Sequence, residues 1–241
     1  MKKASAKISL STAIGMILVC TICALAVTRS GVAAGGATVF SPDKGKLVIQ
    51  LNGETIGSEQ FELTQAGNNW VAKGTTELKV PGTTAATSVS GTLMLQPDGA
   101  PISYDWTSRA DKTNGAHVVF SNGTAKITLQ MQGARPFEQD LSFNAPVIAV
   151  LDNNLYDQYA LLAKLYDWSK RGTQAFPVLI PQDLTPGTIS VEASGSTTLD
   201  GKSYEGLRVT TADLEVLLLL DSNHRLMRLE VPSARVSVVR Q

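Results

Sequence analysis

Few side chains in this sequence could carry out catalysis. Only two histidines occur, His117 and His224, and each lies within or beside a turn sequence. A histidine acts as a general base when a nucleophile and an orienting carboxylate meet it in space. The sequence contains no G-x-S-x-G, H-E-x-x-H or glycine-rich phosphate-binding motif. We therefore predict that the protein is not an enzyme, and a hydrolase with an unrecognised site is the catalytic alternative.

Two acidic patterns could indicate a protease or a metal site. The segment LLLLDSN, residues 217–223, resembles the active-site loop of aspartic proteases, but it ends in Asn where those enzymes have Gly. The sequence has no second such loop, and a turn after an apolar strand accounts for the pattern. Asp152, Asp157 and Asp167 lack the spacing of a calcium-binding loop and fit helix capping and a solvated helix face better. We predict no metal ion and no cofactor.

The N-terminal segment has the pattern of a secretory signal. Three lysines in the first seven residues precede an apolar run over residues 8–27, and small residues follow. This order is typical of a signal peptide, and Ala26 and Ala34 both end acceptable cleavage sites. We predict that residues 1–34 are a signal peptide and that the protein is exported, to the periplasm or outside the cell. The alternative is an uncleaved anchor in the inner membrane, because about 20 apolar residues can span a bilayer.

The two cysteines of the sequence, Cys20 and Cys23, both lie in this N-terminal segment. Neither follows a small residue, so we expect no lipid attachment of the lipoprotein type. The cysteine-free mature chain would contain no disulfide and no thiolate metal site. Removal of residues 1–34 takes away four basic residues and no acidic residue, which leaves 17 basic against 21 acidic residues. Because no basic patch stands out, nucleic acid is not an expected partner.

The rest of the sequence alternates apolar and polar residues with the period of a β-strand. In KLVIQL, for example, Leu47, Ile49 and Leu51 share one face. Turn sequences such as AGNN, PDGAP and SNGT separate these runs at spacings of roughly 8–12 residues, which is typical of antiparallel sheets. We predict a flexible lead-in over residues 35–45 and a single antiparallel β domain over residues 46–241.

One segment, VLDNNLYDQYALLAKLYDW, has a helical pattern instead. Asp152, Asn153 and Asn154 are favourable N-cap residues, and Gly172 can end a helix in a left-handed conformation. Apolar residues recur at steps of three and four, and the apolar arc is wider than that of an ordinary surface helix. We predict a helix over about residues 153–170 that is packed in or across a curved sheet.

This helix has two possible roles. It either fills the interior as core or lines an apolar ligand cavity, for which amphipathic aromatic side chains are well suited. The candidate cavity-lining residues are Tyr156, Tyr159, Leu162, Tyr166 and Trp168. The run LEVLLLL, residues 214–220, does not alternate, which predicts a strand that is either buried on both faces or covered by something on its second face.

The order of segments resembles a family of uncharacterised exported bacterial β-proteins. The resemblance covers roughly residues 47–240 and rests on the hairpins followed by LDNNLYDQYALLAKLYD, FPVLIPQ, YEGLRV and LLLLDSNHRLMRLEVP. It implies an incomplete, half-open β-barrel around one helix, similar in architecture to periplasmic lipoprotein carriers, which hold acyl chains. The motifs carry no catalytic signature, and a shared fold does not establish a shared function.

Three functions remain open at this point. The first is an exported, non-enzymatic binding or carrier protein for an apolar small molecule, a lipid or a cell-envelope protein. The second is a structural or interaction domain of the envelope with a filled core, and the third is the hydrolase. An apolar cavity of about 300–1,000 Å³ beside the helix would favour the first. A filled interior would favour the second, and a histidine with Ser and Asp in a cleft would favour the third.

Overall fold

The computed structural model describes residues 38–79 and 86–241. The predicted signal peptide, residues 1–34, lies outside the described residues, as do the alternative anchor, residues 8–27, and the first part of the predicted lead-in. In the part of the chain that the structure describes, no helix combines the length and the apolar character needed to cross a membrane.

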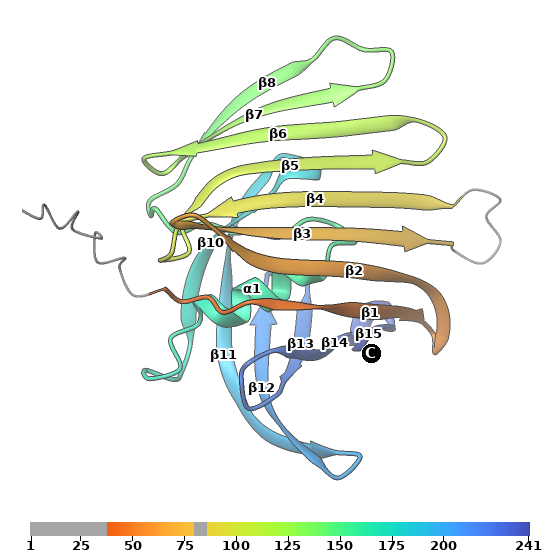
Figure 1. Cartoon of the computed structure of the whole chain (residues 1–241), viewed down its shortest axis with the longest axis vertical. Helices are drawn as coiled ribbons and strands as arrows, with labels where there is room; N and C mark the ends of the chain where they lie inside the picture. Colours follow the sequence, from red (N-terminus) through yellow and green to blue (C-terminus); the bar gives the residue numbers. More distant parts are fainter. Residues whose placement is uncertain (1–37, 80–85) are drawn as a thin grey trace, which may run out of the picture. The chain divides into compact units, whose positions relative to one another are not determined.

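The described residues form one sheet of 15 strands and one α-helix, α1 (Asp157–Leu165) (Figure 1). The first eight strands are β1 (Asp43–Leu51), β2 (Glu54–Ala66), β3 (Asn69–Leu78), β4 (Thr87–Leu95), β5 (Pro101–Arg109), β6 (Thr113–Ser121), β7 (Thr124–Met131) and β8 (Phe137–Ser142). The remaining strands are β9 (Ala149–Val150), β10 (Gln174–Ile180), β11 (Thr185–Leu199), β12 (Lys202–Thr210), β13 (Glu215–Leu220), β14 (Leu226–Val231) and β15 (Val236–Arg240). The predicted mainly β fold with one principal helix is confirmed.

The strand order is β8-β7-β6-β5-β4-β3-β2-β1-β15-β14-β13-β12-β11-β10-β9. All neighbours are antiparallel except β9 and β10, and the pairing of β1 with β15 joins the first and last strands. Within the described residues the end strands β8 and β9 do not pair with each other, so the sheet stays open. Figure 1 shows β1–β8 running across the view, whereas β10–β13 cross that direction and α1 lies between the two groups.

Helix α1 packs between two clusters of buried apolar side chains. Leu162 and Ala163 belong to a cluster with β1 and β10–β15. Leu161, one residue away on the helix, belongs to a cluster with β3–β7, as does Leu155 just before the helix. The helix also contacts strands from both halves of the sheet, β3 and β14. The wide apolar arc in the sequence therefore reflects a helix that is covered on two sides.

The helix is shorter than the predicted span of residues 153–170. Asn154 adopts a left-handed conformation with φ of 65°, which interrupts an α-helix before it can start at residue 153. At the other end, Tyr166 is extended, with ψ of 127°, although its N–H still donates to the Leu162 carbonyl. The prediction that Asp152, Asn153 or Asn154 caps the helix and that Gly172 ends it is therefore wrong: the N-cap is Tyr156 and the C-cap is Tyr166.

The predicted lead-in over residues 35–45 overlaps the β domain. Strand β1 already begins at Asp43, and Val39 N–H donates to the Pro97 carbonyl at 3.0 Å. Phe40 is 4% exposed, and its ring lies 5.8 Å from that of Trp70. Burial of this aromatic side chain attaches residues 39–45 to the domain, so the predicted boundary at residue 46 was wrong.

Of the two alternatives for the apolar run 214–220, burial on both faces is wrong, whereas cover on the second face agrees with the structure. Strand β13 alternates: one face is buried, and the opposite face carries the half-buried Leu217 and Leu219. Arg208 and Arg228 lie directly across from these two leucines on β12 and β14. Long alkyl stems of arginine can cover apolar surface while the charged heads stay in water. Neighbouring arginines, rather than a second layer, thus account for the leucines on this face.

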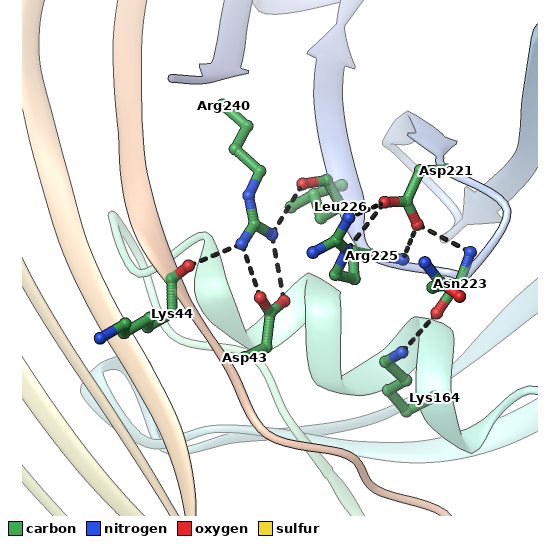
Figure 2. A network of polar contacts seen from close by, with 8 residues as sticks. All are labelled: Asp43, Lys44, Lys164, Asp221, Asn223, Arg225, Leu226 and Arg240. Carbon is green, nitrogen blue, oxygen red and sulfur yellow. Dashed lines mark hydrogen bonds and ion pairs between the residues drawn. The ribbon is translucent and has the colours of Figure 1, made fainter.

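A buried ion pair connects the first strand to the last (Figure 2). Arg240 Nη2 lies 2.6 Å from Asp43 Oδ1 and Nη1 lies 3.0 Å from Oδ2, and the two side chains are only 9% and 6% exposed. The guanidinium also donates to the Lys44 carbonyl at 2.7 Å and lies 5.2 Å from the ring centroid of Phe61. Loss of one partner from such a pair typically costs about 3–5 kcal/mol. The ion pair therefore stabilises the join between the two halves of the sheet.

Candidate functional site

The five predicted cavity-lining residues come together in one cluster. Leu162 and Tyr166 are buried in it, and Tyr156, Tyr159 and Trp168 are half-buried against it. The Tyr166 hydroxyl donates to the Gly172 carbonyl at 2.7 Å and accepts from Ala193 N–H at 3.2 Å. Burial raises the pKa of Tyr156 to about 12. These side chains occupy the space beside the helix rather than surround a large cavity.

Two of the cavities formed by the described residues border α1, and both of these are small. One is lined by residues that include Phe61, Asp157 and Lys164, and the other by residues that include Ile148 and Leu162; each has a volume of about 10 Å³. A volume of this size is about the minimum for a single water molecule. Hollows of about 620 and 500 Å³ lie open along β1–β3, and no residue of α1 lines them.

The N-terminus of α1 is capped by a side chain from a distant strand. Glu59 of β2 is fully buried, and its two carboxylate oxygens accept the N–H groups of Tyr156, at 2.8 Å, and Asp157, at 3.1 Å. No side chain within the helix segment provides a cap. A carboxylate at this end also interacts favourably with the helix dipole. We call Glu59, Asp157, Gly74 and Thr76 the helix seat.

Two carboxyl groups share the helix seat. Burial, followed by the neighbouring carboxyl of Asp157, raises the pKa of Glu59 well above its usual value, and burial also raises the pKa of Asp157. Like charges this close in a dry site disfavour the doubly ionised state of the pair. The two backbone N–H bonds to Glu59 act against this rise, but they are smaller causes than burial and the neighbouring carboxyl.

The floor of the helix seat is made by small residues of β3. A Cβ atom on Gly74 would lie 2.7 Å from Asp157 Oδ1 and 2.8 Å from Glu59 Oε1, too close for either oxygen. Thr76 lies directly across from Glu59, and its hydroxyl is buried without a hydrogen-bond partner in the described structure. The missing side chain at Gly74 therefore makes room for the carboxyl pair.

A second polar cluster holds the segment before the helix. The Tyr104 hydroxyl donates to Asp152 Oδ2 at 2.8 Å and accepts from Gln158 Nε2 at 3.2 Å. Asp152 Oδ1 accepts from Gln182 N–H at 3.1 Å, and Asp152 N–H donates to the Gln158 side chain. Burial raises the pKa of Asp152 to about 6. Asp152, predicted as a helix cap, instead ties the preceding turn to β5 and to the residues after β10.

Neither histidine forms a catalytic arrangement within the described residues. His117 Nδ1 lies 2.7 Å from Asp105 Oδ1 on neighbouring strands, but both side chains are largely exposed and no serine hydroxyl is hydrogen-bonded to the ring. His224 stacks on Trp168 with ring centroids 4.0 Å apart and an interplanar angle of 9°. In the same described part of the chain, no cluster of three or more acidic, histidine or cysteine side chains could hold a metal ion.

The free end of the sheet at β8 is a second candidate site. Phe137 of β8 and Met131 of β7 are 48% and 47% exposed, and Phe137 lies across from the half-buried Leu129, which packs on the core. Glu138 and Asp140 alternate with these residues and are exposed on the opposite face. We call these five residues the β8 rim. Sequence analysis did not single it out, because its alternation resembles that of any other strand.

Comparison with known proteins gives a fold but no function. No protein-family model and no curated protein matches the chain. The structure is similar to a β-barrel-like protein of the domain of unknown function DUF1849 from Brucella abortus, with a TM-score of 0.58 and 9% identity, covering 85% of this chain and 97% of that one. A DUF1089-family protein from Pseudomonas aeruginosa has a TM-score of 0.46 and 9% identity, with 73% and 90% of the two chains covered. The expected likeness to an uncharacterised β-protein is thus confirmed for the fold alone.

Proposed function

We propose that this protein is an exported, non-enzymatic interaction domain of the cell envelope, with an interior filled by its own side chains. The observation that supports this is the packing around α1, where the two bordering cavities each measure about 10 Å³. A cavity that holds a small apolar ligand measures about 300–1,000 Å³. A lipid carrier would therefore have to displace the helix or its aromatic neighbours before it could take up an acyl chain.

The hydrogen bonds of Tyr166 and Trp168, two aromatic residues beside the helix, make such displacement costly. Tyr166 is 2% exposed, and its hydroxyl joins the turn at Gly172 to Ala193 on β11. Trp168 donates its indole N–H to the Ala163 carbonyl at 3.2 Å and contacts the Tyr166 ring edge-on at 5.0 Å. Moving either ring would leave buried polar groups without partners, which costs about 1–3 kcal/mol for each group.

The absence of catalysis is part of the proposal and has its own support. Glu59 and Asp157, two acidic groups with raised pKa values, lie buried in the helix seat, where a substrate could not reach them. The exposed His117–Asp105 pair, by contrast, lies on an open sheet face. A shifted pKa at a buried structural site is a weak indicator of catalysis when no cleft adjoins it.

Native mass spectrometry with organic extraction tests the filled interior. The protein purified from the envelope of expressing cells should show the mass of the polypeptide alone, with no apolar compound in the extract. One lipid molecule per chain would contradict the proposal and restore the carrier interpretation. The mass of the same sample tests export, because cleavage after Ala34 would remove residues 1–34, whereas an anchored protein would keep them.

A cavity variant provides a matched control for the filled interior. Leu162→Ala deletes a fully buried side chain and should leave an apolar cavity that small apolar molecules can enter. Saturating benzene should therefore raise the melting temperature of Leu162→Ala and leave that of the unchanged protein the same. A comparable rise in the unchanged protein would show that its interior already has room for a ligand.

A further inference from the structure

The two ends of the sheet are protected to very different degrees. Strand β9 has only two residues, Ala149 and Val150, and both are at most 4% exposed. Strand β8 has six residues, none of them buried, and within the described residues it pairs only with β7. An exposed edge strand is a template for pairing with another chain, and proteins usually shorten or cover such edges. The fold covers one edge in this way and leaves the other open.

The backbone of β8 has hydrogen-bonding groups available at this edge. Phe143 N–H, one residue after the strand, donates to the Gly123 carbonyl on the β7 side at 2.6 Å. In an antiparallel ladder the bonding direction alternates from residue to residue. The N–H and C=O groups of Glu138 and Asp140 therefore point away from β7, toward the free edge.

The side chains of the β8 rim specify what could pair there. A strand added beside β8 would place alternate side chains next to Phe137 and Leu141 on the inner face, where apolar groups would cover the exposed ring. Its other side chains would lie beside Glu138 and Asp140 on the outer face. Glu138 lies 3.6 Å from Lys126, whereas Asp140 forms no ion pair within the described residues. Basic side chains in the added strand would complement this acidic face.

We propose that the β8 edge binds an extended segment of another protein, in which apolar and basic residues alternate, as an additional strand of the sheet. This inference rests on the proposed interaction function and names the chemistry of the partner. Main-chain hydrogen bonds provide affinity in this mode of recognition, and alternate side chains provide specificity. A second copy of this chain is a poor occupant, because antiparallel pairing of two β8 strands would bring Glu138 and Asp140 of both copies together.

Binding of a synthetic peptide tests the proposal directly. The probe is a fluorescently labelled nine-residue peptide that alternates valine and lysine, added to the full domain. We expect saturable binding by fluorescence anisotropy and slower hydrogen exchange at the amides of Glu138 and Asp140. The same peptide with N-methyl groups on alternate residues, and a valine–glutamate peptide, should each bind at least tenfold more weakly. Equal binding of the N-methylated peptide, or protection elsewhere in the domain, would overturn the proposal.

A charge-reversed variant separates edge recognition from general attraction to an acidic protein. Glu138→Lys combined with Asp140→Lys should reverse the preference, so that the valine–glutamate peptide binds at least tenfold more tightly than the valine–lysine peptide. Glu54→Lys combined with Glu62→Lys, two exposed positions on β2, makes the same change in net charge and should preserve the original preference. An unchanged preference in the β8 variant would refute the assigned partner.

The result of the peptide-binding experiments is independent of the test of the proposed function. A co-purifying lipid in the native mass spectrum would contradict the filled interior, whatever the β8 edge binds. Failure of all peptides to protect β8, in a protein that carries no lipid, would overturn only the edge assignment. A dimer in analytical ultracentrifugation that protects the β8 amides would also overturn it, because the occupant would then be a second copy.

Discussion

The helix seat and the β8 rim use similar residues in opposite environments. Each combines two acidic side chains with neighbouring aromatic or apolar groups. In the helix seat, Glu59 and Asp157 are at most 6% exposed, and their oxygens are occupied by backbone N–H groups and by each other. At the rim, Glu138 and Asp140 are exposed, and the ring of Phe137 is half in water. The difference teaches that burial, rather than residue type, decides whether a carboxylate serves folding or remains available to a partner.

The largest expected effect is at the helix beside the seat. Leu162→Asp would place a charge in a site that is 1% exposed and offers no cation. An unpaired buried charge costs several kcal/mol, so we expect a loss of about 4 kcal/mol or more, or no folded protein at all. Circular dichroism during thermal or urea unfolding measures this change.

A volume-conserving variant controls for the position itself. Leu162→Met keeps the apolar character and should cost less than about 1.5 kcal/mol. If Leu162→Asp melted near the temperature of the unchanged protein, the assignment of this helix face to the core would be wrong.

A smaller effect is expected from filling the floor of the helix seat. Gly74→Ala would place a methyl group within 2.8 Å of two carboxylate oxygens, so the carboxyl pair or the helix has to shift. Overpacking of this kind typically costs about 1–3 kcal/mol, measurable by urea unfolding. Gly187→Ala, in strand β11, is the matched control, because its added Cβ meets only Val178 at an ordinary 3.4 Å. Equal stabilities of the two variants would show that the seat has spare room.

The raised pKa values of Glu59 and Asp157 predict a pH dependence of stability. Folding raises the pKa of Glu59 and Asp157, so the unfolded chain loses these protons at lower pH than the folded protein does. The free energy of unfolding should therefore fall as the pH rises from about 4, and by about 1.4 kcal/mol for each unit of pKa shift. Asp152 adds a similar loss between its usual value of 3.8 and about 6.

Asp157→Asn isolates the contribution of the pair. It removes one carboxyl with a raised pKa and also the charge that raises the pKa of Glu59, so this variant should lose less stability than the unchanged protein between pH 5 and pH 8. His224, whose pKa is lowered mainly by burial, acts in the opposite direction in both proteins and cancels in the comparison. Glu62→Gln, exposed on the same strand as Glu59, should keep the original slope. Parallel slopes for Asp157→Asn and the unchanged protein would argue against the coupling of the two carboxyl groups.

The local patterns of the sequence were sufficient to predict the sheet and the existence of the helix. Alternation and turn residues act over a few neighbours, so KLVIQL and SNGT could be interpreted without tertiary information. The ends of the helix could not be predicted in this way, because they depend on contacts such as that of Tyr166 with Ala193, 27 residues away. For the same reason the sequence could not show which residues cover the second face of β13, since the arginines that lie across from Leu217 and Leu219 belong to neighbouring strands.

The sequence does contain an indication of the helix seat, in the alternation pattern of β2. Glu59 shares its strand face with the buried Phe61 and Leu63, so its position in the alternation already points inward. Gly74 and Thr76 occupy the corresponding inward positions on β3. A charged residue at a core position predicts a buried partner, but not its identity, because the Tyr156 N–H that it binds lies 97 residues away. Contacts between residues so far apart in the sequence are determined by the tertiary structure.

The smallest expected change in stability is at the β8 rim, and it gives the sharpest test of the comparison. Phe137→Ser removes a ring that is 48% exposed at the edge of the sheet, so the free energy of unfolding should change by no more than about 0.5 kcal/mol. Binding of the valine–lysine peptide should nevertheless weaken by about tenfold, because the inner face of the added strand loses its apolar neighbour. Val119→Ser, at a position that is 45% exposed on the other face, is the matched control and should leave both quantities unchanged. If Phe137→Ser destabilised the fold as much as Gly74→Ala, the rim would belong to the core, and the contrast between the two regions would fail.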